Sequence, residues 1–261
     1  MKRVIRANLR EAPLMPDRSG EDAVTHQFAV VIPTYNHGRQ LRDVLAKTLR
    51  LSFPVFVVDD GSTDSTPQVL ASFSQVTVLR HDQNLGKGAS LLNGFSLALN
   101  VADYAVTLDA DGQHDPDDIP SLVRAVPDHE RALVLGKRSG MEHASVPWTS
   151  RWGRKFSNFW MWASCGRWVA DSQSGFRVYP LPETLGLGAR SRRFQFEVEI
   201  LVRAVWSGIS VLEVPVSARY QSAGERVSHF RPLLDFMRNS KVFTKLILTR
   251  IFVSSSDRKK R

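Results

Sequence analysis

The chain has 261 residues, of which 43% are hydrophobic, and it carries 35 Lys and Arg against 26 Asp and Glu. This length and apolar content suit one large α/β domain or two small ones and argue against a disordered protein. The charge is uneven, since residues 1–225 hold 25 basic and 24 acidic residues whereas residues 226–261 hold 10 and 2. A near-neutral body with a basic tail argues against a nucleic-acid-binding protein.

The chain offers no sign of secretion or of a membrane span. Its single Cys165 cannot form an intrachain disulfide, and the N-terminus lacks the apolar run and cleavage site of a signal peptide. The most apolar stretch, 242–253, falls short of the roughly 20 residues that cross a bilayer. We therefore expect a cytoplasmic protein that lies on a membrane if it meets one.

Short apolar runs alternate with amphipathic stretches over the first half of the chain. Residues 1–25 lack a sustained period and are expected to form a flexible leader. The pattern then predicts strands at 28–32, 55–58, 76–79 and 104–108, and helices at 39–49, 66–73 and 88–99. Such alternation is typical of an α/β protein with a mostly parallel central sheet flanked by helices. Later elements are a helix at 194–206, a strand at 211–216 and a long closing helix at 231–253.

The segment LDADGQHDP, at 108–116, is the most specific local signal. Asp109 and Asp111 directly follow a predicted buried strand, where two carboxylates can together bind Mg²⁺ or Mn²⁺. Such a cation bridges the oxygens of a diphosphate and neutralises its charge as it leaves. The alternative is a solvated acidic turn that caps a helix beginning near Pro116.

Three other polar segments follow predicted strands or precede a helix, namely PTYN at 33–36, DDGSTD at 59–64 and NLGKG at 84–88. The Tyr35 ring can stack on a base, Asp60 can accept a hydrogen bond from a base edge, and Lys87 lies near a helix N-terminus that suits an anion. Taken alone, each could be a turn or a helix cap. The chain has no P-loop and no G-x-G-x-x-G, which weakens the ATPase and dinucleotide interpretations.

These motifs in this order, followed by LGKRSG at 135–140 and DSQSGFRVYP at 171–180, resemble the inverting family 2 glycosyltransferases of the GT-A fold. Within that family the chain is most similar to the dolichyl- or polyprenyl-phosphate sugar transferases. The resemblance covers about residues 28–220 and implies a nucleotide-diphospho-sugar donor and Mg²⁺ or Mn²⁺ as cofactor. It implies a GT-A domain over 26–225. Proteins of this family often continue with a transmembrane pair or a long conserved tail, whereas the charge pattern here predicts only a basic amphipathic helix and tail over 226–261.

Matching the motifs residue by residue implies a donor site and a metal site. The residues that the resemblance assigns to the donor are Pro33, Tyr35, Asn36, Asp59, Asp60, Lys87, Asp109 and Ala110. Those that it assigns to the metal are Asp109 and Asp111, with Gln113 completing the coordination. Asp60 is expected to contact the base, and Lys87 to lie near the nucleotide.

The acceptor side depends on the acceptor's chemistry. The resemblance places Arg138 against phosphates, and Asp171, Ser174, Gly175 and Arg177 near the sugar. A hydroxyl acceptor must lose a proton, which makes Asp171 the candidate base, whereas an anionic phosphate needs cations, which makes Arg138 and Arg177 the important pair. Asp171 could instead be a structural cap.

Two features favour a lipid-linked acceptor. Five of the six Trp lie between 148 and 168, among several cations, and residues 233–253 form a basic amphipathic pattern ahead of Arg258–Arg261. Core packing is the alternative for both, and residues 228–231 could form a lid. The sequence thus predicts transfer to a polyprenyl-phosphate-like acceptor at the inner membrane face, by a peripheral enzyme. The alternatives are transfer to a glycan or lipid hydroxyl and a non-catalytic nucleotide-sugar-binding module.

Overall fold

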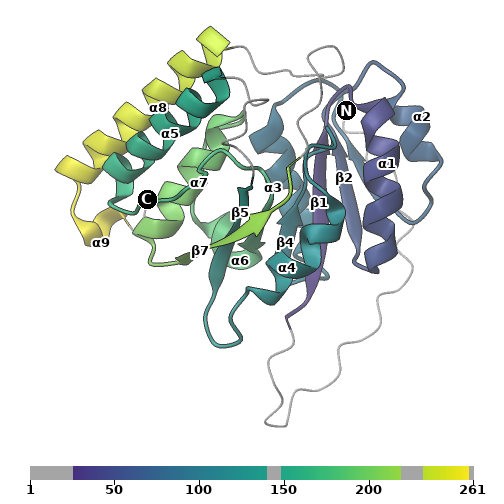
Figure 1. Ribbon diagram of the computed structural model, residues 1–261, viewed down its shortest axis with the longest axis horizontal. Helices are drawn as coiled ribbons and strands as arrows, with labels where there is room; N and C mark the ends of the chain where they lie inside the picture. The colour runs from purple at the N-terminus through teal and green to yellow at the C-terminus, as the bar shows by residue number, and fades with distance from the viewer. Residues whose placement is uncertain (1–25, 140–147, 219–231, 259–261) are drawn as a thin grey trace, which may run out of the picture.

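The computed structural model describes residues 26–139, 148–218 and 232–258 (Figure 1). The predicted leader at 1–25, the lid at 228–231 and the last three basic residues, 259–261, lie outside these ranges. The strands are β1 (Phe28–Thr34), β2 (Val55–Asp59), β3 (Thr77–Arg80), β4 (Tyr104–Thr107), β5 (Ala132–Arg138), β6 (Arg177–Pro180) and β7 (Ser210–Val216).

These strands form one sheet in the order β3-β2-β1-β4-β6-β5-β7. β6 is antiparallel to both of its neighbours, and every other pairing is parallel. The expected mostly parallel sheet flanked by helices is therefore confirmed. β1 extends beyond the predicted end at residue 32, because the Thr34 carbonyl still accepts a hydrogen bond from Asp60 N at 2.8 Å.

Helices cover both faces of the sheet (Figure 1). They are α1 (Gly38–Thr48), α2 (Thr66–Ala71), α3 (Lys87–Ala98), α4 (Ile119–Arg124), α5 (Trp148–Cys165), α6 (Leu181–Gly186), α7 (Gln195–Trp206), α8 (Pro232–Phe252) and α9 (Ser255–Arg258), with 3₁₀ turns at Leu49–Leu51 and Pro116–Asp118. Alternate residues of β1 point to opposite faces. Val30 and Ile32 pack with α1, α2 and α4, whereas Val31 packs with α3 and α7. The two hydrophobic cores meet at the sheet, which explains why its central strands are continuously apolar.

The long closing helix α8 packs on the domain, and it also exposes a second face. Phe243 and Leu246 are buried toward α5 and α7, with the Trp160 and Phe243 ring centroids 6.4 Å apart. Arg250 donates to the carbonyls of Trp162 and Ala163 at the end of α5, at 3.2 and 2.7 Å. No helix in the described part of the chain is both long and apolar enough to cross a membrane.

Candidate active site

The PTYN and DDGSTD segments meet at the carboxyl ends of β1 and β2. Asn36 has a left-handed backbone with φ 56°, its N–H donates to Ser62 Oγ at 2.9 Å, and its Oδ1 accepts from Thr63 N at 2.8 Å. Tyr35, beside it, is half-buried. Asn36 therefore joins the two loops, and parallel strands place them at the edge of the sheet where ligands bind in such folds.

Two of the three carboxylates of DDGSTD, Asp59 and Asp60, are buried and bind neighbouring backbone. Asp60 accepts hydrogen bonds from Leu85 N and Gly86 N, both at 2.8 Å, and pairs with His81 Nδ1 at 2.8 Å. Asp59 accepts from Ser62 N at 2.9 Å and lies 3.5 Å from Arg80 Nε. Asp60 thus holds the backbone of the NLGKG loop in place. Only 3% of its surface is exposed, so it lies under the loops that the sequence assigns to the donor.

Lys87 lies between two carboxylates at the start of α3. Its Nζ is 2.6 Å from Asp109 Oδ1 and 2.6 Å from Glu197 Oε1. Burial opposes the charge of Lys87, but the two carboxylates together raise its pKa above the usual value. Burial likewise opposes ionisation of Asp109, but the Lys87 ammonium outweighs it and lowers the pKa of this carboxyl. Lys87 and Asp109 are therefore both charged at neutral pH.

Sequence reasoning missed Glu197. It lies on α7 with 6% of its surface exposed, and Glu199 on the same helix pairs with Arg203. The sequence does contain a sign of it, since two acidic residues interrupt the apolar run QFEVEILV. Carboxylates in such a run are expected to be buried, and a buried carboxylate requires a partner.

The DSQSGFR segment closes over this cluster through Gly175. A Cβ at this position would come within 2.5 Å of Asp109 Oδ2 and 2.7 Å of Lys87 Nζ. Thr107 Oγ1, at the end of β4, donates to the Gly175 carbonyl at 2.6 Å and fixes the approach. A larger residue here would push these charged groups aside, and the close packing brings the predicted acceptor loop against the predicted metal residue Asp109.

The predicted metal residues form a tight turn after β4. Asp111 Oδ1 accepts from Gln113 N at 2.9 Å, and Gly112 takes the left-handed conformation with φ 73° that the turn needs. Among the described residues, no group of three or more His, Cys, Asp and Glu could hold a metal ion. The carboxylates of Asp109 and Asp111 with the Gln113 amide are nevertheless hard oxygen donors, and they fit a divalent cation that takes its other ligands from phosphates and water.

Arg138, which is half-buried, forms a bidentate pair with the fully buried Asp171. Arg138 Nε donates to Asp171 Oδ2 at 2.7 Å, and its Nη2 donates to Oδ1 at 2.8 Å. Burial opposes ionisation of Asp171, but its bonds to Arg138 hold the pKa of this carboxyl below its usual value. Both carboxylate oxygens of the candidate base are thus occupied by a permanent cation.

Arg177 bonds mainly to backbone carbonyls. It is fully buried, and it donates to the carbonyls of Ser172, Ser174 and Glu197 at 2.8, 2.7 and 2.7 Å. These bonds shape the backbone of DSQSGFR. The inner face of α5 supports the same segment, since Asn158 Oδ1 accepts from Ser172 N at 3.0 Å. The structure therefore brings Arg138 and Asp171 together and places Arg177 behind the loop.

The chain is similar in sequence to two named sugar transferases. A dolichyl-phosphate N-acetylglucosaminyltransferase of Methanococcus voltae is 29% identical over 73% of this chain and 85% of its own length. A polyprenol monophosphomannose synthase of Mycolicibacterium smegmatis is 30% identical over 79% of this chain and 84% of its own.

A solved structure of glucosyl-3-phosphoglycerate synthase from Mycobacterium tuberculosis, with Mn²⁺, UDP-glucose and phosphoglyceric acid, shares the fold. Its TM-score is 0.63 at 21% identity, over 86% of this chain and 79% of that one. The model of the family described as "Glycosyl transferase family 2" matches residues 29–189. The chain belongs to glycosyl transferase family 2 and is a glycosyltransferase.

Proposed function

We propose that this enzyme transfers a sugar, with inversion, from a nucleotide-diphospho-sugar to a polyprenyl-phosphate acceptor, with a divalent metal, at the cytoplasmic face of a membrane. The Arg138–Asp171 pair is the observation that carries the choice of a phosphate acceptor. A hydroxyl acceptor needs a base to remove its proton, and a carboxylate with a lowered pKa and both oxygens bound to Arg138 is a weak base. The lipid phosphates in the relatives' names support the same choice.

In the proposed reaction an oxygen of the acceptor phosphate attacks the anomeric carbon as the bond from that carbon to the diphosphate oxygen breaks. The nucleoside diphosphate leaves with the bonding electrons. No proton has to be removed, because a phosphate monoester is anionic at neutral pH. Catalysis then depends on positioning and charge neutralisation, and we assign Arg138 to the acceptor phosphate with Asp171 as its positioning residue.

The donor binds, in this proposal, over the loops that Asn36 and Asp60 hold together. Tyr35 flanks the base, and Lys87 neutralises the diphosphate from the start of α3. Asp109, Asp111 and Gln113 hold Mg²⁺ or Mn²⁺, which when bound neutralises the charge that builds on the leaving diphosphate. Arg177 acts indirectly by fixing the carbonyls of the acceptor loop.

Asp171→Asn tests the phosphate acceptor directly. The amide keeps the shape but loses the charge that fixes Arg138, so we expect the KM for a short-chain prenyl phosphate to rise roughly tenfold. The pH profile of kcat should keep its shape. A fall in kcat of roughly a hundredfold or more, together with loss of the acidic limb of that profile, would make Asp171 a base and favour a hydroxyl acceptor.

The donor is identified by thermal shift with UDP-, GDP- and dTDP-sugars, each with and without Mn²⁺. A ligand that binds the folded state alone raises its stability by mass action. We expect one nucleotide series to stabilise the protein in the presence of metal, and Asp111→Asn to remove that gain. A gain that needs no metal and survives in Asp111→Asn would contradict the metal role.

A further inference from the structure

The exposed apolar side chains of this protein gather on one pair of helices. Ten large hydrophobic residues are exposed in the described part of the chain, and seven of them belong to α5, to α8 or to the turn after α5. These seven are Phe159, Trp162, Trp168, Met237, Leu248, Ile251 and Phe252. Scattered exposed hydrophobics are ordinary, but a contiguous group marks a binding surface. Figure 1 shows α5 and α8 side by side at one edge of the molecule.

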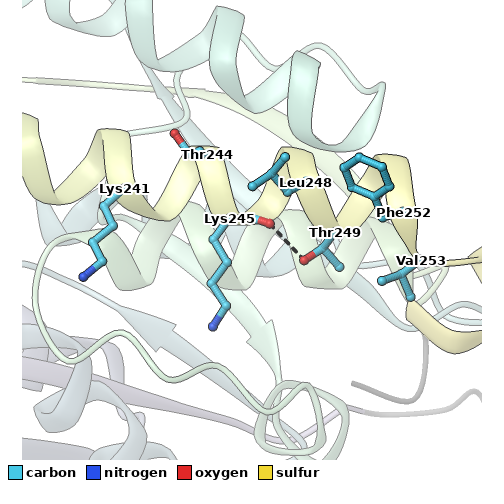
Figure 2. Close-up of a pocket in the computed structure, with 7 residues that line it drawn as sticks. All are labelled: Lys241, Thr244, Lys245, Leu248, Thr249, Phe252 and Val253. Carbon is cyan, nitrogen blue, oxygen red and sulfur yellow. Dashed lines mark hydrogen bonds between the residues drawn. The ribbon is translucent and has the colours of Figure 1, made fainter.

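On α8 the exposed side chains form a stripe opposite the packed one. Met237, Lys241, Lys245, Leu248 and Phe252 recur at intervals of three or four residues, which places them on one side of a helix. Figure 2 shows the Lys241 and Lys245 side chains running alongside each other, with Leu248 and Phe252 farther along the helix. They line a shallow hollow of about 490 Å³. Phe252 is 79% exposed.

α5 presents a stripe of the same composition. Lys155, Phe159 and Trp162 are exposed at intervals of four and three residues, and the rings of Phe159 and Trp162 lie 6.0 Å apart between centroids. Residues 148–165 and 236–256 contain no Asp and no Glu. We name these two stripes the α5–α8 face. It combines large apolar groups with positive charge and carries no carboxylate.

The composition of the α5–α8 face distinguishes between two kinds of binding partner, a second copy of the protein and a lipid bilayer. A second copy docked face to face would bring the lysines of both copies together without carboxylates to neutralise them. A bilayer with anionic lipids suits the face, since aromatic rings settle at the headgroup level while lysine stems lie along apolar surface with their charges in the headgroup layer. We infer that the α5–α8 face docks this enzyme on an anionic lipid bilayer.

Docking through α5 brings the acceptor side of the site to the lipid headgroups. The inner face of α5 holds the segment around Asp171, because Ser157 Oγ and Ser172 Oγ are 2.9 Å apart and Asn158 Nδ2 donates to the Ala170 carbonyl at 2.7 Å. The outer face of α5 therefore contacts lipid, and its inner face holds the predicted acceptor loop. The docking deepens the membrane location already given in the proposed function, and this last step rests in addition on the proposed lipid-phosphate acceptor.

Flotation with lipid vesicles tests the inference on the full-length protein. We expect vesicles of phosphatidylcholine with phosphatidylglycerol to bind it at least roughly tenfold better than vesicles of phosphatidylcholine alone. The double variant Trp162→Glu with Phe252→Glu should lose binding by roughly tenfold or more, since both side chains would enter the bilayer interface. Both are exposed, so the Tm should not change.

Leu99→Glu is the matched control, because Leu99 is 41% exposed and lies at the end of α3, and it should keep wild-type vesicle binding. Unchanged binding by the double variant would overturn the inference. So would a wild-type dimer in solution that the double variant converts to monomer without any vesicle binding. Transfer to a water-soluble short-chain prenyl phosphate separates the two claims. Vesicle binding without such transfer removes the proposed function and keeps the docking face.

Discussion

Three acidic residues of the site, Asp60, Asp109 and Asp171, each have a fixed partner within the fold. Asp60 binds two backbone N–H groups, Asp109 binds Lys87, and Asp171 binds Arg138. The sequence predicted the loops of Asp60 and Asp109, because each follows an apolar strand, whereas Asp171 was expected only from the resemblance of the DSQSGFR segment. It could not predict their partners, since Lys87 and Glu197 are 110 residues apart and meet only when α7 packs against α3.

Glu197→Gln separates a positioning role from a structural one. Glu197 and Asp109 both bind the Lys87 ammonium. When Glu197 loses its charge, Lys87 pairs with Asp109 alone and competes with the metal for that carboxylate. We expect the Mn²⁺ concentration for half-maximal activity to rise roughly tenfold, with kcat changed less. Glu199→Gln, on the same helix and 5% exposed, is the matched control. It should lower stability and leave the Mn²⁺ requirement unchanged. An unchanged requirement in Glu197→Gln would contradict the assignment.

Among the helices and strands, the regular alternation up to β4 could be predicted, and β5, β6 and α5 were not. β6 is four residues long and contains an arginine, which gives no apolar run to recognise. Arg177 is tolerated there because its guanidinium donates to two carbonyls of the preceding loop and to one carbonyl of α7. The aromatic and basic composition of α5 has two causes. One face of the helix bonds to the predicted acceptor loop, and the other face is exposed.

Arg250→Met tests how α8 is held on the domain. The Arg250 guanidinium bonds to the last carbonyls of α5, which otherwise lack partners within that helix. We expect a loss of about 1 kcal/mol in the free energy of unfolding, measured by urea titration. Lys245→Met, on the exposed stripe of the same helix, should change that free energy by less than about 0.5 kcal/mol. Equal stability of the two variants would show that the Arg250 contact does not hold α8.

For the whole molecule, one buried histidine links stability to pH. His114 is 4% exposed, and burial lowers its pKa to about 4 from the ordinary 6.5. Below pH 6.5 the unfolded chain takes up a proton there that the folded protein does not, so the free energy of unfolding falls as pH drops toward 4. We expect a loss of about 2 kcal/mol from this residue between pH 7.5 and 5.

Urea unfolding of the wild type and of His114→Gln at both pH values isolates this contribution. The variant has no imidazole to protonate, so its stability should fall less between the two pH values, by about 2 kcal/mol. An identical fall in both proteins would mean that His114 is protonated in the folded state.

The formal charge of +9 also divides along the molecule. The body is nearly neutral because residues 1–225 hold 25 basic and 24 acidic residues, and the excess lies beyond residue 225. The structure divides the basic closing segment further. Arg250 and Arg258 bond back to the domain, with Arg258 placed 5.7 Å from the Trp206 ring centroid, while Lys241 and Lys245 are exposed. The sequence could predict the amphipathic pattern of this segment, but not which of its Arg and Lys side chains would contact the domain.

Release of nucleoside diphosphate from the matching sugar donor, with a prenyl phosphate or the corresponding prenol as acceptor, tests the central claim most directly. Both acceptors have the same lipid and differ in the attacking group. We predict metal-dependent release with the phosphate and release at the background rate with the alcohol. Equal turnover of the two acceptors, or turnover of the alcohol alone, would contradict a phosphate acceptor positioned by Arg138.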